Sequence, residues 1–293
     1  MTSIQPSPIF APPATPYLAS LPESAGSTRP AAAIYGAPLD LTESFRDGAR
    51  HGPGAVRYMS DSLESYSPTL DRDLADLVVR DLGDLELNEL GIEGAIATIA
   101  SAAAYAAGTA QLAVMLGGEH AASLGSFRGI KRVHPDAVII QADAHLDMRP
   151  EYEGQPLTHA TWLHHVGRDF GFEVIHQVGL RSGDRGEWQL ARASTAWSST
   201  ELSLPHAVRD RIGRLPVYLS IDIDVLDPAH APGTGCPEPG GVTFRELASF
   251  LHALEGLHVV GMDVMEVSPS LDPANITAAA AAKLVREAIL LFG

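Results

Sequence analysis

The chain has 293 residues, 45% of them hydrophobic and 19% charged, a composition that excludes a disordered chain and fits a globular protein. Its 20 basic and 36 acidic side chains give a formal net charge of -16, which argues against nucleic acid or an anionic membrane as a partner. One cysteine excludes an internal disulfide, and we find no secretory signal and no apolar run of roughly 18 residues, so we expect a cytoplasmic protein.

The first 30 residues differ from the rest of the chain because they are rich in Pro, Ser, Thr and Ala. Proline lacks the backbone N–H group that regular pairing requires. We therefore expect residues 1–30 to form an N-terminal arm that lies over the surface of the protein or over a neighbouring subunit. One folded domain is expected over residues 31–293.

From residue 31 onward, short apolar runs alternate with longer segments of helical periodicity. Strands are predicted at 31–35, 77–82, 111–116, 137–142, 173–180, 216–222 and 258–265. Helices are predicted at 92–107, 121–132, 159–168, 205–213, 243–254 and 276–291, and Thr243 and Glu246 have the spacing of a capping box. This alternation predicts a single three-layer α/β/α domain with a mostly parallel sheet.

Polar residues follow three of the predicted strands, where open α/β sheets place their sites. After the first, Gly117 and Gly118 allow a tight turn that presents His120 at the edge of the sheet. Taken alone, this Gly-Gly-Glu-His segment is also typical of an ordinary turn. It therefore needs support from the other two segments.

The second segment places Asp143, His145 and Asp147 directly after the apolar run 138–141. Alternate side chains of an extended segment share a face, so these three side chains are expected to converge on one point. Charged groups at the end of a buried strand need partners. The pattern indicates a metal site; the alternative is that these are ordinary polar residues on the protein surface.

The third segment places Asp222 and Asp224 at the end of the apolar strand 216–222. They alternate with apolar residues, so both carboxylates are expected to point to the same side. Two neighbouring carboxylates repel each other unless a cation or a proton lies between them. The following Asp227-Pro228 is interpreted as a structural turn.

The three segments together supply six ligand groups of mixed carboxylate and imidazole type. Such a set suits first-row divalent metals such as Mn²⁺, and six groups suit two ions with a bridging carboxylate. A chain with one cysteine has no thiolate cluster for structural zinc. Two ions that share one water molecule generate a hydroxide at neutral pH. The predicted ligands are His120, Asp143, His145, Asp147, Asp222 and Asp224.

Five motifs follow one another along the chain. They are Gly117-Gly118-Glu119-His120, Asp143-Ala144-His145-Leu146-Asp147, the segment 220–228, the segment 232–241 and Met262-Asp263-Val264-Met265-Glu266-Val267. In this order they resemble the motifs of the arginase and agmatinase (ureohydrolase) family, and most closely those of agmatinases of the archaeal and thermophile type. The resemblance covers roughly residues 30–293 and implies an arginase-like fold, a ureohydrolase catalytic domain over residues 31–293, and a homotrimer or homohexamer.

The resemblance also implies a role for each site residue. One Mn²⁺ would be held by His120, Asp143, Asp147 and Asp222, and the other by Asp143, His145, Asp222 and Asp224, with Asp143 and Asp222 bridging; Ni²⁺ or Co²⁺ would suit the same ligands. A metal-bound hydroxide would attack the guanidinium carbon. The catalytic residues would be Glu266, which pairs with the guanidinium, His159, which shuttles a proton, and the ligand Asp147.

The segment 147–160 is similar to the loop of agmatinases and lacks the Asn and Ser with which arginases hold an amino-acid carboxylate. We therefore expect a small cationic guanidinium substrate, agmatine, cut to putrescine and urea in polyamine biosynthesis. Glu151 and Glu153 are interpreted as solvated surface residues, with binding of the distal ammonium group of the substrate as the alternative for each. Other candidate substrates are N1-aminopropylagmatine, guanidine and 4-guanidinobutyrate; Arg149 is the nearby residue that could hold the carboxylate of the last.

Two residues depart from the motifs of the family. Glu119 stands where the family usually has Asp, and we expect this change to affect only the surroundings of the ligands. Cys236 stands where the family usually has a threonine near the substrate, which puts that contact in doubt.

Two rival functions fit the sequence less well. A metal-dependent deacetylase needs three ligands and a His-His pair before the Asp-x-His segment, whereas His164-His165 come after it here. A ureohydrolase-like subunit without activity would be expected to lose ligands, and this chain keeps all six together with His159 and Glu266. Both alternatives are therefore disfavoured.

Overall fold

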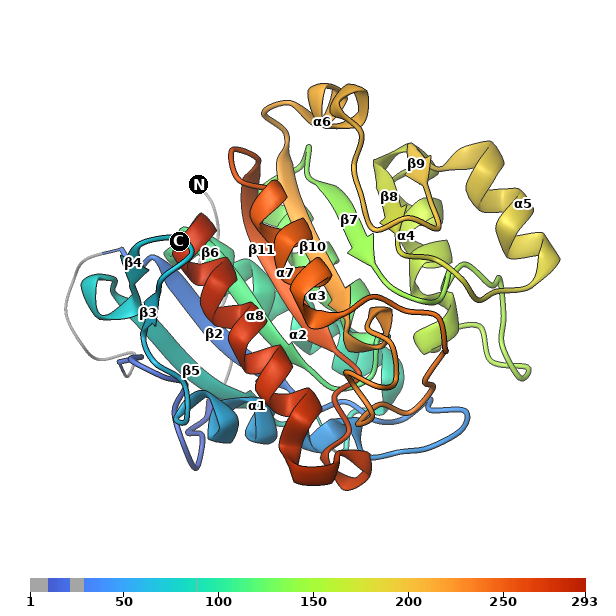
Figure 1. The fold of residues 1–293 in the computed structure, drawn as a ribbon. Helices are drawn as coiled ribbons and strands as arrows, with labels where there is room; N and C mark the ends of the chain where they lie inside the picture. Colours follow the sequence, from blue (N-terminus) through green and yellow to red (C-terminus); the bar gives the residue numbers. More distant parts are fainter. Residues whose placement is uncertain (1–9, 22–28, 88) are drawn as a thin grey trace, which may run out of the picture.

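The middle layer of the fold is a nine-stranded sheet with the strand order β1-β5-β2-β6-β11-β10-β7-β8-β9 (Figure 1). The computed structural model describes residues 10–21, 29–87 and 89–293. All neighbouring strands of this sheet are parallel except β1, which pairs antiparallel with β5. The strands are β1 (Phe10–Ala11), β2 (Ala32–Ala37), β5 (Val79–Leu85), β6 (Leu112–Gly117), β7 (Val138–Ala142), β8 (Ile175–Val178), β9 (Trp197–Ser198), β10 (Pro216–Asp222) and β11 (His258–Met265), and a separate hairpin pairs β3 (Tyr66–Ser67) with β4 (Arg72–Asp73).

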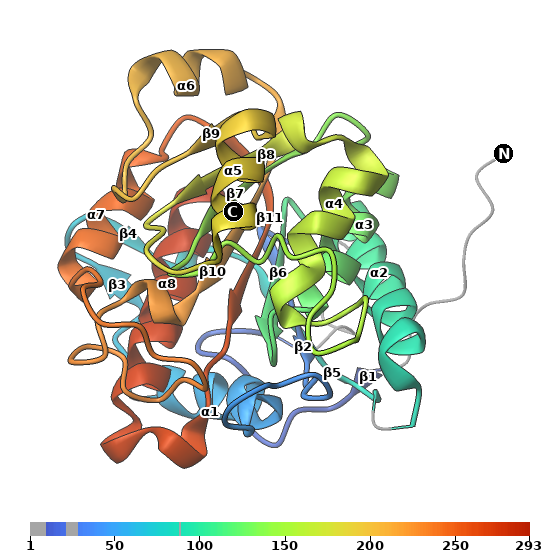
Figure 2. The same cartoon turned by 90° about the vertical axis from the view of Figure 1, so that its right-hand side faces the viewer.

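Helices cover both faces of the sheet, so the predicted three-layer α/β/α arrangement is confirmed (Figure 2). One face carries α1 (Gly52–Ser60), α7 (Phe244–Ala253) and α8 (Ile276–Phe292). The other face carries α2 (Gly91–Thr109), α3 (Ala122–Val133) and α4 (Trp162–Phe170), while α5 (Arg185–Ser194) and α6 (His206–Ile212) lie at the β8–β9 side. In the described ranges, no helix has the length and apolar character to cross a membrane.

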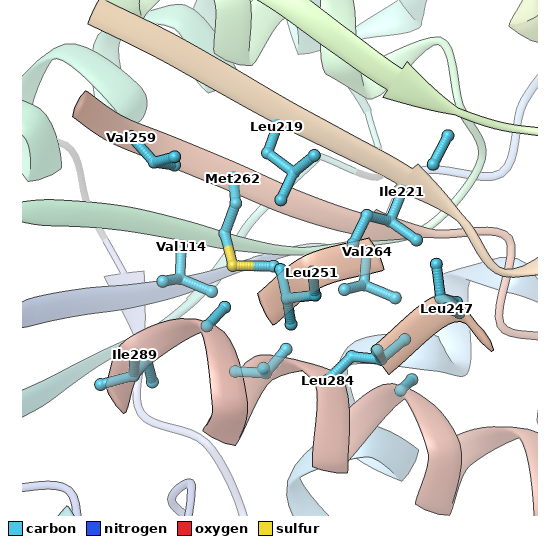
Figure 3. Packing of buried hydrophobic residues seen from close by; sticks show 14 of the residues in the cluster. Val114, Leu219, Ile221, Leu247, Leu251, Val259, Met262, Val264, Leu284 and Ile289 are labelled. Carbon is cyan, nitrogen blue, oxygen red and sulfur yellow. The ribbon is translucent and has the colours of Figure 1, made fainter. Parts of the chain in front are cut away.

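The central strands are apolar on both faces because each face is covered by helices. On one face, Val114, Leu219 and Val264 pack against Leu251 of α7 and Leu284 of α8 (Figure 3). A second cluster fills the space between the opposite face and helices α2, α3 and α4. The buried strands therefore have no freedom to shift, and their carboxyl ends are held at defined positions.

All seven predicted strands and all six predicted helices are present, and the capping box at Thr243 is formed. Helix α1 was not predicted because its first residues, Gly52-Pro53-Gly54, have the composition of a turn, although proline is tolerated in the first helical turn. Helix α5 was not predicted either, although it begins with a capping box between Asp184 and Glu187 that the sequence contains.

Part of the Pro-rich segment lies in the described range and packs on the domain. Phe10–Ala11 pairs with β5, so the expectation that this segment makes no regular pairing is wrong there. The pairing is possible because these two residues precede the prolines and because Gly83 of β5 has no side chain to collide with the Ala11 carbonyl. Tyr17 is buried, and its hydroxyl donates to the Ala282 carbonyl at 2.6 Å. Residues 1–9 and 22–28 lie outside the described residues, and a boundary at residue 30 stays a prediction.

A buried ion pair joins α1 to β5. The guanidinium of Arg57 donates from Nε and Nη2 to the two oxygens of Asp81 at 2.8 and 2.9 Å, and both side chains are 1% exposed. We expect Arg57→Leu to lower the free energy of unfolding by about 3–5 kcal/mol, because it leaves the Asp81 carboxylate buried without its partner. Urea denaturation measures this. Arg128→Leu, which breaks the partly exposed pair with Asp169, is the control, with an expected loss below about 1 kcal/mol.

Candidate active site

Four adjacent strands in the middle of the sheet bring the predicted residues to one edge. The strands lie in the order β6, β11, β10 and β7. His120, Glu266 and Asp143 come just after β6, β11 and β7, and Asp222 is the last residue of β10. Parallel strands end at the same edge, so residues more than a hundred positions apart in sequence become neighbours. The sheet order therefore accounts for the meeting of three separate sequence segments.

His120 is at the centre of the first group of side chains. Its Nδ1 atom lies 3.1 Å from Oδ2 of Asp143, 3.2 Å from Oδ2 of Asp147 and 3.0 Å from Oδ2 of Asp222. All four side chains are buried. Four atoms with lone pairs thus surround one small volume.

His145 forms the second group with Asp224 and Asp143. Its Nδ1 atom is 2.8 Å from Oδ2 of Asp224 and 3.7 Å from Oδ1 of Asp143. Asp143 therefore faces His120 with one oxygen and His145 with the other. The structure thus brings the six predicted ligand residues together as two groups linked by one carboxylate.

The extended conformation expected for these segments is wrong, although the residues do meet. Asp147 has φ 52°, in the left-handed region, so the segment from Asp143 is not a regular extended strand. Asp224 lies in a short 3-10 helix (Ile223–Val225), and its N–H donates to Oδ1 of Asp222 at 2.8 Å. Backbone turns, rather than strand alternation, direct these carboxylates to one point.

The donor set fits divalent metal ions. The Nδ1 atom of His120 is buried, and although three carboxylate oxygens lie within 3.2 Å of it, no described residue is in hydrogen-bond geometry with it. In the described part of the chain, no lysine or arginine is ion-paired with the four clustered aspartates. Burial, together with Asp147 and Asp224, raises the pKa of Asp143 to about 7, and burial raises the pKa of Asp222 well above its ordinary value. A cation at these oxygens would remove the repulsion that otherwise favours protonation.

Hydrogen bonds from behind orient the clustered side chains. The Nε2 atom of His120 is 2.9 Å from the Ser220 hydroxyl, which donates to Oδ1 of Asp263 at 2.7 Å. The indole N–H of Trp162 donates to Oδ2 of Asp147 at 2.9 Å. Such contacts fix ring orientation and carboxylate direction around a metal site. Asp263 and Ser220 lie within the sequence motifs but received no role from sequence, because a role of this kind depends on which strands are neighbours.

Glu119 makes its hydrogen bonds outside the ligand cluster, which agrees with the expectation that this replacement of Asp affects only the surroundings of the ligands. Its Oε2 atom accepts from the N–H and the hydroxyl of Thr42 at 2.7 and 3.0 Å. The Thr42 hydroxyl oxygen in turn accepts from the N–H of His159 at 3.0 Å. Glu119 therefore connects the loop after β2 to the loop that carries His159.

A cavity of about 220 Å³ opens onto both groups of ligands, and Glu266, His159 and Cys236 also line it. Oε1 of Glu266 accepts from the backbone N–H of His120 at 2.6 Å, which brings this carboxylate next to the cluster. Cys236 is a half-buried free thiol, and burial raises its pKa. The predicted catalytic residues thus share one cavity with the predicted ligands.

The structure bears on the residues considered for the substrate tail. Glu151 and Glu153 are exposed and are absent from the described residues that line the cavity, in agreement with surface solvation. Arg149 does line it, but its Nε atom is 3.2 Å from Oε2 of Glu187, and its guanidinium lies 4.9 Å from the centre of the Tyr152 ring. Glu43 and Glu187 are the lining carboxylates that sequence reasoning missed.

Comparison with known proteins agrees with this geometry. A family model described as the arginase family matches residues 30–291. An agmatinase of Bacillus cereus is 40% identical over 261 residues, which cover 88% of this chain and 90% of that protein, and a guanidinobutyrase of Pseudomonas aeruginosa is 32% identical over 269 residues, covering 87% and 84%. The solved structure of agmatine ureohydrolase of Thermoplasma volcanium superposes with a TM-score of 0.77 at 29% identity and covers 91% of this chain and 95% of that one. The chain therefore belongs to the arginase family and is a ureohydrolase enzyme.

Proposed function

We propose that this enzyme hydrolyses agmatine to putrescine and urea with the help of two divalent metal ions, Mn²⁺ in the first instance. The observation that supports this most strongly is the shared cavity. All of the predicted ligands except Asp143 line the same space of about 220 Å³ as Glu266 and His159. A small guanidinium substrate in this space would meet the nucleophile, the orienting carboxylate and the proton carrier together.

The ligands would divide between the two ions as the paired groups suggest. His120, Asp143, Asp147 and Asp222 would hold one ion, and Asp143, His145, Asp222 and Asp224 would hold the other. The bound ions would supply Lewis-acid activation of water, which lowers the pKa of water enough to provide a nucleophile at neutral pH.

Glu266 would hold the guanidinium group of the substrate in place. Its carboxylate is 7% exposed and is fixed through Oε1 by the N–H of His120. A carboxylate pairs with two parallel N–H groups of a guanidinium, so the pairing supplies direction as well as attraction. The guanidinium carbon would then be presented to the nucleophile beside the ligand cluster.

His159 would carry the proton from the nucleophile to the leaving amine. Burial lowers the pKa of His159 below its ordinary value, so the ring is neutral at neutral pH and able to accept a proton. Its Nε2 atom is 3.4 Å from the Ser44 hydroxyl, and its Nδ1 atom has no hydrogen-bond partner among the described residues. The backbone N–H of His159 donates to the Thr42 hydroxyl and so fixes the backbone from which the ring extends into the cavity.

His159→Asn is expected to lower kcat by about 10²–10⁴-fold with little change in KM, because a general acid and base is lost while the binding groups remain. Steady-state urea release measures both constants. The exposed His206 gives the matched control, since His206→Asn removes an imidazole outside the cavity. Unchanged kcat in the folded His159→Asn variant would contradict the assigned role.

The lining of the cavity favours a substrate with a cationic tail. Glu43 and Glu187 line it in addition to Glu266, and Arg149 is its only lysine or arginine among the described lining residues. Glu187 lies beside Arg149 and offsets its positive charge, so the lining offers the carboxylate of 4-guanidinobutyrate or arginine a weaker attraction than an unpaired arginine would. A substrate tail that ends in an amine needs no positively charged side chain in the cavity lining.

Urea release from the Mn²⁺-loaded enzyme tests the proposal, with kcat/KM compared for agmatine, N1-aminopropylagmatine, arginine, 4-guanidinobutyrate and guanidine. We expect agmatine to be preferred. Preference for the aminopropyl derivative would support the proposed reaction but with a longer cationic substrate. Preference for a carboxylate-bearing substrate would contradict the proposal that the substrate has a cationic tail. We further propose that the enzyme is cytoplasmic and forms a homotrimer or a homohexamer. Light scattering of the purified protein measures the oligomeric state.

A further inference from the structure

Glu43 is a second carboxylate in the inner cavity, on the loop between β2 and α1. It lines the same cavity as Glu266, and burial together with the charge of Glu43 raises the pKa of Glu266. Its Oε2 atom lies against Gly235, where a Cβ atom would be 3.4 Å away. Its Oε1 atom is buried and has no partner among the described residues. Nothing in the proposed reaction uses this carboxylate.

The loop that carries Glu43 is fixed on both sides. Before it, the N–H of Thr42 donates to Glu119 at 2.7 Å. After it, Arg46 donates from Nε to the Gly235 carbonyl at 3.0 Å and from Nη2 to the Thr234 carbonyl at 2.9 Å. The Glu43 carboxylate is therefore held at the cavity wall by a rigid connection between two loops, rather than by a mobile tip.

A second polar atom of the same wall also lacks a partner. Thr234 is 1% exposed and lines the cavity, and its Oγ1 atom has no hydrogen bond within the described residues. A buried polar atom without a partner costs about 1–3 kcal/mol. These two atoms, Oε1 of Glu43 and Oγ1 of Thr234, belong to residues that line the same cavity as Glu266, and both are acceptors that a donor-rich ligand could satisfy.

A guanidinium group has the matching chemistry. It is a planar cation with up to five N–H donors and no acceptor, and one carboxylate can take only two of those donors. In a buried site the remaining donors need acceptors as well. Two adjacent carboxylates repel each other unless a cation lies beside them, and burial raises the pKa of Glu43 to about 7.

We propose that Glu43 is a second guanidinium-binding carboxylate, which together with Glu266 clamps the substrate guanidinium and accepts an N–H that Glu266 does not reach. This inference rests on the proposed function for its substrate class. A clamp that holds the guanidinium equally in the ground state and in the transition state affects KM more than kcat. It also selects for guanidinium groups whose terminal nitrogens carry no substituent.

Isothermal titration calorimetry with guanidinium chloride on the Mn²⁺-loaded enzyme tests the clamp, with sodium chloride of equal ionic strength as the blank. We expect Glu43→Gln to weaken guanidinium binding about tenfold, since it removes one charge from a charge-assisted pair. KM for agmatine should rise by a similar factor, with kcat changed by less than about threefold. Asp47→Asn is the matched control, because Asp47 is an exposed carboxylate on the same loop and does not line the cavity.

Glu43→Val removes the acceptor as well as the charge and gives a second variant in case the first one does not fold. Wild-type affinity for guanidinium in either folded variant, or no binding by the wild type, overturns the clamp. Loss of affinity in Glu43→Gln but not in Asp47→Asn supports it. If the wild type releases no urea from agmatine while guanidinium binding still depends on Glu43, the proposed substrate fails and the clamp stands.

Discussion

Asp143→Asn is expected to lower kcat/KM for urea release by at least about 10³-fold, because several kcal/mol of metal-ion catalysis depend on this one carboxylate. Oδ2 of Asp143 faces His120 and Oδ1 faces His145, so this side chain links both ligand groups. Its oxygens also accept from the Gln141 side chain and from the His145 N–H, both at 2.6 Å. The N–H₂ group of asparagine would face one of these donors and would provide no lone pair for a cation.

Elemental analysis of the purified variant, with urea release measured on the same sample, checks this prediction. We expect fewer than two ions per chain after reconstitution with Mn²⁺. Asp136→Asn is the matched control, since Asp136 is an exposed carboxylate before the other end of the same strand. A variant that binds two ions and turns over at the wild-type rate would show that Asp143 does not bridge them.

Glu266→Gln is expected to lower kcat/KM by at least about a hundredfold while leaving the metal content unchanged. The amide oxygen of glutamine can still accept the N–H of His120, so the ligand cluster keeps its support. The lost negative charge leaves the substrate guanidinium without its buried partner, and a truncated buried charge pair is costly. The variant therefore separates the binding of substrate from the binding of metal.

Two measurements on one preparation decide the case. Metal analysis should give the wild-type stoichiometry, and kinetics with agmatine should give a strongly reduced kcat/KM. Glu201→Gln, at an exposed position, controls for the loss of a surface charge. Loss of metal in Glu266→Gln would mean that Glu266 supports the cluster, whereas unchanged kinetics would remove it from the reaction.

The strained backbone of the site was not readable from sequence. Asp147 and Glu266 both have positive φ, at 52° and 64°, although neither is a glycine. Non-glycine residues persist in this region only where the surrounding structure holds them, and they gather at functional sites. The hydrogen bonds from Trp162 to Asp147 and from His120 to Glu266 provide such support, and both depend on packing across distant segments.

The sequence by itself determined the fold class, because helical and strand periodicities alternate from residue 31 onward and parallel strands must be apolar on both faces. It also determined the candidate ligands, since charged side chains directly after buried strands need a partner, and a cation is the partner that clustered carboxylates require. The sequence did not predict the helix that begins at Gly52-Pro53-Gly54 or the very short strand Phe10–Ala11, because local composition does not reveal tertiary pairing.

Only the tertiary structure decided which strands are neighbours, and therefore which residues support the site. The order β6-β11-β10-β7 places Asp263 behind Ser220 and His120, and it brings Glu266 beside them. The shared cavity of Glu43 and Glu266 and the ion pair of Arg149 with Glu187 bring together segments that share no motif. Periodicity reports the local environment of each residue, whereas contacts between distant segments arise from strand order and loop packing, which no local pattern encodes.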